Sequence, residues 1–580
     1  MTAYWKRSTD PVPEKLRSLI GKIPICRDFA GRIARRELRL RLQALRQTQR
    51  PDGDPWKGLR ILTEVSKVPL VAKTDEILYG SHCTTAEIDA RACTAVLKYA
   101  LGSAIFWKLP LAISGGRAIS LAAPDVWREK FAAQGIKVDM PKSNIAWKMR
   151  QLRFIAYGFR VAKQYFEHAW KNRRFDLRPP YWIAERFPTQ NFSADAHDHP
   201  SYQLPNYIVE HLGKNGPKGW VLVGQPNSTF HRASAEVVFS PLAFPPLTGT
   251  LNVLGFGVDC FKVIAISALR WIQGRVYAPA LIQDALEIRY LRRLSDDRLP
   301  NWYISTHTGV GGRPLWVAET EARGVKTAIV YYSINNQPIQ FAMDQTPPPV
   351  NPEHLLLNWK RYLVSDEFQK DWIKSVAQGD PEIIPLGNIP LQDNGRDLPD
   401  LPARTVSVFD IPVLRDSYFV LHGERKSIYS EKYVCQFLTD ISESLENLGI
   451  HMALKAKRTR TGQISKFSSK QQLRLANKII ESGHCTNIDH EIAAQRLMQK
   501  TAASISIPFS STAPSAANLG KPSIYYDPSG QLKVSGNQNH GVEVIRGRAS
   551  LEEWLRKTFP MDSDAKMLAT GKAAGPTSVV

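Results

Sequence analysis

The chain has 580 residues, of which 43% are hydrophobic and 22% are charged. This composition is that of a globular protein of several domains, and it excludes a collagen-like, coiled-coil or wholly disordered chain. Lysine and arginine number 76 against 54 aspartates and glutamates, which gives a net charge of +22. We therefore expect anionic partners: nucleic acid, an acidic membrane surface or a phosphorylated small molecule.

Residues 1–60 are predicted to form a basic helical extension. Between residues 13 and 50 there are eleven lysines and arginines and three acidic residues, and Ile33, Leu38, Leu40, Leu42 and Leu45 are spread among the arginines. Such a helix packs on the body of the protein or lies on anionic lipid. Both interpretations stay open, whereas aromatic residues that would stack on bases are sparse here.

The beginning of the chain has no apolar region typical of a secretory signal. The six cysteines are scattered and form no C-x-x-C pair, which fits a reducing compartment. We expect a cytoplasmic protein that is peripheral to the inner face of the membrane.

Residues 61–378 are predicted to be an N-terminal α/β domain. Residues 108–140 are read as strand, glycine turn, helix and strand, and residues 313–335 as a helix that Gly324 ends, followed by a buried parallel strand. An irregular insertion is expected near residues 170–300. Its apolar part, residues 237–273, is interrupted by prolines and charges, so we expect a core segment or a membrane-surface contact instead of a span.

The second half of the chain has a clearer pattern. Residues 379–403 are rich in proline and are predicted to be a linker, and residues 562–580 a disordered tail. Between them, residues 404–561 alternate short β-rich runs with helical patterns that end at glycines such as Gly449 and Gly483. This alternation predicts a Rossmann-like domain, a parallel sheet with helices on both faces.

A hydroxyl-rich turn follows one strand of this domain. In an open parallel sheet, ligands bind at the carboxyl ends of the strands. Ser510, Ser511 and Thr512 arrive there at the start of the next helix, where free N–H groups favour phosphate. The alternative is that Ser510 or Ser511 simply caps the helix.

A basic cluster lies in residues 450–480, which contain no acidic residue. Lys455, Lys457 and Arg458 stand at the end of a predicted strand and should reach the same rim as the hydroxyl turn. Together the two features suit a diphosphate. The alternative is a solvated basic face, and nucleic acid would need a longer basic track.

Residues 505–530, ISIPFSSTAPSAANLGKPSIYYDPSG, resemble the signature of the polysaccharide-biosynthesis PFTS motif proteins, with Ser510 in place of the threonine. The resemblance extends to FDIP at 409–412, LKAKR at 454–458 and, more loosely, residues 313–335. It implies a glycosyltransferase of surface polysaccharide synthesis. It also implies the α/β fold class called GT-B, two Rossmann-like domains facing a cleft.

The resemblance also implies roles for individual residues. Lys455, Lys457 and Arg458 take the position of a Lys/His-Pro segment in related sialyltransferase-like enzymes, but this chain lacks the His-Pro, which puts a histidine general acid there in doubt. Ser510, Ser511 and Thr512 would hold the donor phosphate. Three residues would lie near the base and ribose: Tyr525, Tyr526 and Asp527.

Inverting transfer needs a general base for the acceptor hydroxyl. The candidates are His307, Glu319 and Asp410, and the alternative for each is a hydrogen-bonded structural residue. The paired His197 and His199 lack a third metal ligand. We see no D-x-D where a metal-dependent donor site would need one, since Asp562 and Asp564 lie in the predicted tail, so we expect no metal and no cofactor.

The expected function is transfer of a sugar from a nucleotide donor to a lipid-linked or polysaccharide acceptor in O-antigen-type or capsule-type biosynthesis. Whether the sugar is a hexose or of the sialyl or Kdo type stays open. One alternative is an alditol-phosphate transferase of the same pathway class. Another is a non-enzymatic nucleic-acid-binding protein, which only the charge favours, so we expect no nucleic-acid partner.

Overall fold

A computed structural model describes residues 56–560 of the chain, with internal gaps. The gaps are 103, 176, 186–202, 213–218, 224–230, 233–236, 241, 307–312, 332–333, 335–338, 343, 345, 388–395, 412, 414–427, 457–468, 491 and 535–537. The predicted extension up to residue 55 and the predicted tail therefore lie outside the described residues.

The first sheet has eight strands in the order β3-β4-β2-β1-β5-β6-β8-β9. They are β1 (Trp182–Glu185), β2 (Trp220–Val223), β3 (His231–Arg232), β4 (Val237–Ser240), β5 (Trp302–Ser305), β6 (Lys326–Tyr331), β8 (Arg361–Val364) and β9 (Glu382–Pro385). All neighbours are parallel except β3 and β4. The strand order reverses between β1 and β5, as in a doubly wound sheet.

The second sheet repeats this winding with six parallel strands in the order β12-β11-β10-β13-β14-β16. They are β10 (Thr405–Phe409), β11 (His451–Lys455), β12 (Cys485–Ile488), β13 (Ala503–Ser506), β14 (Ser523–Asp527) and β16 (Glu543–Arg546). Counted along the chain the order is 3-2-1-4-5-6, the Rossmann order. Two such sheets in one chain confirm the predicted fold class, α/β with two Rossmann-like units.

Helices cover both faces of the second sheet: α16 (Glu431–Asn447), α17 (Lys470–Glu481), α18 (Ala494–Lys500), α19 (Thr512–Asn518) and α20 (Arg548–Thr558). Val406 and Val408 pack against α16, α17 and α20, whereas Phe409 packs with α18 and α19. Because helices cover both faces, all five residues of β10 are buried, including the polar Thr405 and Ser407.

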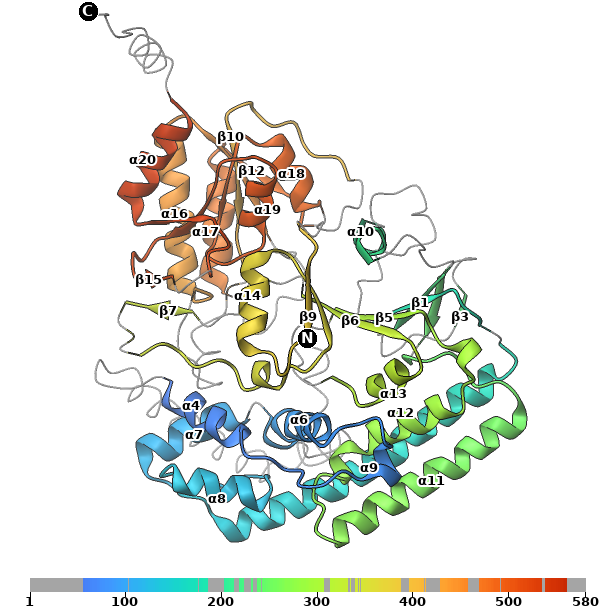
Figure 1. The fold of residues 1–580 in the computed structure, drawn as a ribbon. Helices are drawn as coiled ribbons and strands as arrows, with labels where there is room; N and C mark the ends of the chain where they lie inside the picture. The colour runs from blue at the N-terminus through green and yellow to red at the C-terminus, as the bar shows by residue number, and fades with distance from the viewer. Residues whose placement is uncertain are drawn as a thin grey trace, which may run out of the picture.

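The first unit begins with a helical layer (Figure 1). Its helices are α4 (Lys57–Ser66), α5 (Glu76–Tyr79), α6 (Thr85–Ala95), the π-helix η1 (Val96–Leu101), α7 (Ala104–Gly115), α8 (Asp125–Ala133) and α9 (Met140–Asn172). Further along the chain follow α10 (Gln203–Leu212), α11 (Thr250–Ile272), α12 (Ile282–Arg292), α13 (Trp316–Ala322) and α14 (Glu367–Val376), with short 3-10 turns at η5 (Pro279–Leu281), η6 (Asp296–Arg298) and η7 (His354–Leu356).

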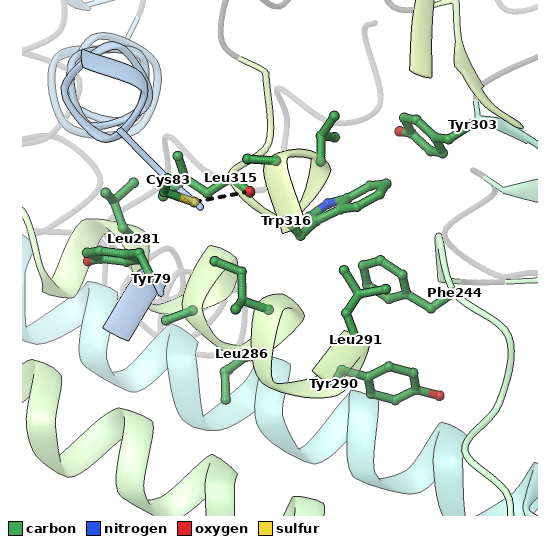
Figure 2. Packing of buried hydrophobic residues seen from close by; sticks show 14 of the residues in the cluster. Tyr79, Cys83, Phe244, Leu281, Leu286, Tyr290, Leu291, Tyr303, Leu315 and Trp316 are labelled. Atoms are coloured by element: carbon green, nitrogen blue, oxygen red, sulfur yellow. Dashed lines mark hydrogen bonds between the residues drawn. The ribbon is translucent and has the colours of Figure 1, made fainter. Parts of the chain in front are cut away.

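The core of the first unit lies between this layer and the sheet. Most of α12 is buried, so its apolar side chains meet α9, α11 and α13 on different sides. Figure 2 shows Trp316 between Phe244 and Tyr303, with T-shaped ring contacts at 4.8 and 4.6 Å. The Cys83 thiol donates to the carbonyl of Leu315 at 3.4 Å in the same cluster.

Three predictions about this half are wrong. Residues 104–115 form a helix where residues 108–140 were expected to begin with a strand, because a short apolar run fits either element. The insertion predicted near 170–300 is not irregular throughout, since α11 and α12 lie in it. The predicted linker 379–403 starts too early, because β9 belongs to the first sheet.

The two units meet through a small ribbon and a side-chain pair. Strand β7 (Gln340–Phe341) pairs antiparallel with β15 (Leu532–Lys533). The Nδ1 atom of His540 lies 2.9 Å from Oδ2 of Asp366, the residue that caps α14. The Phe368 ring packs on the His540 ring with centroids 6.2 Å apart.

Candidate functional site

The carboxyl edge of the second sheet brings two predicted site segments together. Strands β10 and β13 are neighbours, and Phe409 is in register with Ser506. Asp410 directly follows β10, and the turn Pro508–Ser511 follows β13. Both segments therefore leave the sheet at the point where the strand order reverses, where ligands of open α/β sheets bind.

The backbone of this turn is held in an unusual conformation. Phe509 has a φ of 62°, and it shares a positive φ with only one other non-glycine residue of the described chain, His540. A left-handed conformation costs an L-residue roughly 1–2 kcal/mol. Burial offsets this cost, because Phe509 is 1% exposed and contacts the Tyr525 ring at 5.8 Å. The Tyr525 hydroxyl also donates to the Ser510 carbonyl at 2.9 Å.

The hydroxyls of Ser510 and Thr512 form hydrogen bonds within the turn, whereas that of Ser511 does not. Thr512 lies 2.8 Å from the Ser506 hydroxyl and 3.0 Å from the Ser510 hydroxyl, and Ser510 donates to the Ile507 carbonyl at 3.0 Å. Ser511 is the N-cap of α19 but forms no side-chain cap hydrogen bond. The alternative that the Ser511 hydroxyl caps the helix is therefore wrong. Its half-buried hydroxyl makes no hydrogen bond to the described residues.

Lys455 was expected to be an exposed positive charge at the carboxyl edge of the sheet, but its side chain is buried. It ends β11 and is 6% exposed, and its Nζ donates to the carbonyls of His490 and Asp489 at 2.8 and 3.4 Å. Burial lowers the pKa of Lys455 to about 8, an effect that Asp489 and Asp410 partly oppose. Lys455 therefore ties β11 to the loop after β12. Lys457 and Arg458 lie outside the described residues.

Asp410 is buried at 6% exposure, and its Oδ2 accepts a hydrogen bond from Nε2 of Gln472 at 3.1 Å. Gln472 lies in the first turn of α17, where its backbone N–H donates to the Ser469 hydroxyl. Sequence reasoning missed Gln472. The Ser469–Gln472 spacing is that of a capping box, and this signal would have placed Gln472 at a helix start near the same edge.

The proposed base and ribose contacts lie in the core instead. Tyr526 is fully buried and donates to Asp440 at 2.7 Å, and burial raises the pKa of its phenol. Asp527 is also fully buried and accepts from the Tyr433 hydroxyl at 2.9 Å and from the backbone N–H of Leu532 at 2.8 Å. Both side chains have structural partners in the core, which argues against their contacting the base and ribose of a donor.

The carboxylate of Glu319 also has a structural partner. It lies on α13 at 5% exposure and pairs with the Arg292 guanidinium through both oxygens, at 2.9 and 3.0 Å. This geometry favours a structural ion pair over a general base. His307 lies outside the described residues, and it follows Thr306, whose N–H donates to Glu185 at the order reversal of the first sheet.

Among the described residues there is no group of three histidines, cysteines, aspartates or glutamates that could hold a metal ion. His197 and His199 lie outside these residues. The absence of a metal or other cofactor therefore stays a prediction.

The chain is a Rossmann-type α/β protein with two doubly wound sheets. In the second sheet, a strained turn that carries hydroxyl groups lies beside the point where the strand order reverses, which is where ligands bind in such sheets. Residues 262–555, slightly more than half of the chain, match the family model described as "Polysaccharide biosynthesis PFTS motif protein". The chain belongs to this family. The turn Pro508–Ser511 lies within the matched residues and resembles the motif that the family's description names, with Ser510 in place of the threonine.

No curated protein matches the chain in sequence. Among solved structures it is similar to a pneumococcal O-GlcNAc transferase, GtfA, bound to UDP and GlcNAc (13% identity, 50% of this chain and 55% of that one, TM-score 0.29). It is also similar to a UDP-glucose:anthocyanidin 3-O-glucosyltransferase bound to UDP (10% identity, 69% of this chain and 96% of that one, TM-score 0.33). A third similar structure is the wall teichoic acid polymerase TagF (12% identity, 73% of this chain and 96% of that one, TM-score 0.33). Likeness this distant does not bear on the chemistry of the chain.

Proposed function

We propose that this chain is a glycosyltransferase of surface polysaccharide biosynthesis that uses a nucleotide-activated sugar. The observation that carries the proposal is the position of the family's motif: a turn with a left-handed phenylalanine beside the order reversal of a Rossmann-type sheet. Strained backbone is retained where the surrounding structure and function require it, and this edge is where nucleotides bind in such sheets. The family's description supports the pathway class.

In this reaction the bond between the anomeric carbon and the phosphate oxygen breaks as an acceptor hydroxyl attacks the carbon. The leaving nucleotide gains negative charge, so hydrogen-bond donors and cations at its phosphate accelerate the step. The Ser511 hydroxyl supplies a donor, and Lys457 and Arg458, which follow β11 along the chain, supply charge. Lys455 positions the end of β11 for them. Metal is not required by this scheme.

The acceptor hydroxyl loses its proton to a general base. Asp410 and His307 are the remaining candidates, because Glu319 is occupied by Arg292. The acceptor is a growing polysaccharide or a lipid-linked saccharide, made on the cytoplasmic side of the membrane.

The test begins with a thermal-shift screen of nucleoside mono- and diphosphates, followed by calorimetry with the nucleotide that binds. The double variant Ser511→Ala with Lys457→Ala should lose about tenfold or more in affinity, since charge-assisted hydrogen bonds contribute roughly 1.5–3 kcal/mol each. The matched control is Ser482→Ala with Lys557→Ala, which removes the same groups before β12 and on α20, away from this edge.

Wild-type affinity in the first double variant would show that the phosphate binds elsewhere. The reaction class is tested separately by mass spectrometry of the product. A glycosyltransferase adds a sugar without phosphorus, whereas an alditol-phosphate transferase adds phosphorus.

A further inference from the structure

The outer surface of the helix pair α9 and α11 is unusually apolar. Sixteen large hydrophobic side chains are exposed in the described part of the chain, and thirteen of them lie on these two helices. The two helices pack side by side and form the outermost layer at the base of Figure 1. Soluble surfaces rarely gather large apolar side chains in this way unless they bind something.

Helix α11 supplies the more apolar part. Its buried side chains face the core, whereas its opposite side presents apolar residues at helical spacings of three, four or eight positions: Leu251 (85% exposed), Leu254, Val258, Phe261 (70%), Leu269 and Ile272 (79%). By length and composition α11 is the one described helix that could cross a membrane, with a mean hydropathy of 1.6 over 18 residues and 33% of that window buried.

Contacts on the inner side of α11 argue against a crossing helix. Asp259 pairs with Arg293 at 2.6 Å, and Arg270 pairs with the buried Asp75 at 2.7 Å. Phe256 is fully buried in the core of the first unit. A helix that crossed a bilayer would have to leave these partners, whereas a helix that lies in the surface of a bilayer keeps them.

Helix α9 adds positive charge and aromatic rings to the same layer. It carries seven lysines and arginines and one glutamate. Arg153 and Arg160 are exposed on it beside the exposed Leu152 and Phe159, and the Arg173 guanidinium lies 4.5 Å above the ring of Trp170. Apolar and aromatic side chains flanked by basic ones are the pattern of surfaces that lie on anionic lipid.

We infer that the outer face of α9 and α11, called here the α9/α11 face, docks the protein on an anionic lipid bilayer without crossing it. Charge decides against two other occupants. A second copy would bring another basic face against the first. The segment of residues 13–50, with eleven basic and three acidic residues, would likewise be repelled. The inference does not depend on the proposed sugar transfer.

The experiment measures binding of the full-length protein to vesicles of phosphatidylcholine with and without phosphatidylglycerol. The wild-type protein should bind the anionic vesicles, and added salt should weaken the binding. Leu254→Gln with Phe261→Gln should lower the partition coefficient about tenfold or more. Arg153→Glu with Arg160→Glu should lower it about tenfold to a hundredfold.

The matched control is Arg556→Glu with Lys557→Glu, which makes the same charge change on α20 and should keep wild-type binding. An unchanged melting temperature would show that each variant is folded. Wild-type vesicle binding in either α9/α11 variant would overturn the inference and assign binding to another segment. A wild-type dimer in light scattering that the apolar variant dissociates, with no vesicle binding, would overturn it in favour of a second copy.

Discussion

Replacing Lys455 with methionine tests whether this lysine is buried against the loop after β12 or is a solvated cation at the carboxyl edge of the sheet. In the folded chain burial lowers its pKa to about 8, against about 10.4 for a lysine in an unfolded chain. A difference of about 2.5 pKa units corresponds to a cost of about 3 kcal/mol in the free energy of folding when the lysine is charged.

The sign of the pH dependence follows from proton binding. Below about pH 8 both states hold the proton, so the full cost is present. Between about pH 8 and 10.4 the unfolded state binds more protons than the folded state, so stability rises with pH. By about pH 9.5 the wild-type protein should recover about 2 of the 3 kcal/mol.

Urea unfolding of wild-type protein and Lys455→Met at about pH 7 and about pH 9.5 measures this effect. Methionine keeps the length of the side chain but does not titrate, so the pH dependence shared with all other groups cancels in the difference. We expect that difference to move about 2 kcal/mol in favour of the wild type over this interval. A constant difference would mean that Lys455 titrates as an ordinary solvated lysine, and the assignment as a tie would be wrong.

Three further substitutions probe other parts of the structure by unfolding, by nucleotide titration and, for Glu319, by a sugar-transfer assay. Glu319→Gln should lower the free energy of unfolding by about 1–3 kcal/mol, because it weakens the ion pair with Arg292, and should leave nucleotide affinity unchanged. Loss of sugar transfer with unchanged stability would instead identify Glu319 as the general base. His540→Asn should be more stable than His540→Ala by about 1 kcal/mol, because asparagine tolerates the positive φ of 50°; equal stabilities would contradict this. Gly158→Ala should lower the free energy of unfolding by about 1–3 kcal/mol, since the added Cβ would lie 2.5 Å from Cγ2 of Ile282. An unchanged melting temperature would show that α9 and α12 can move apart at no cost.

The second unit could be predicted well from the sequence because each element carried its own local signal. The predicted helix ends at Gly449 and Gly483 correspond to glycines with φ of 61° and 89°. The hydroxyl turn was predicted at the carboxyl ends of the strands, and the structure puts it there, beside the end of β10 that Asp410 follows.

What the sequence did not predict depends on contacts between distant residues. Glu319 pairs with Arg292 across 27 positions, and no local pattern links them. Tyr526 and Asp527 end a strand that helices cover, so their side chains turn inward to Asp440 and Tyr433. Strand β9 was missed because proline and glycine surround it, although Ile383 and Ile384 form an apolar pair.

The ribbon of β7 and β15 has a practical consequence for dividing the chain. Residues 340–341 precede the second unit by some sixty positions, yet their backbone pairs with Leu532 and Lys533, and the Ala342 N–H donates to Gln531 at 2.6 Å. A fragment cut near residue 404 would leave β15 with bare N–H and C=O groups that invite pairing with other chains. Chimeras that exchange the C-terminal half between relatives should therefore take both partners of the ribbon from one parent.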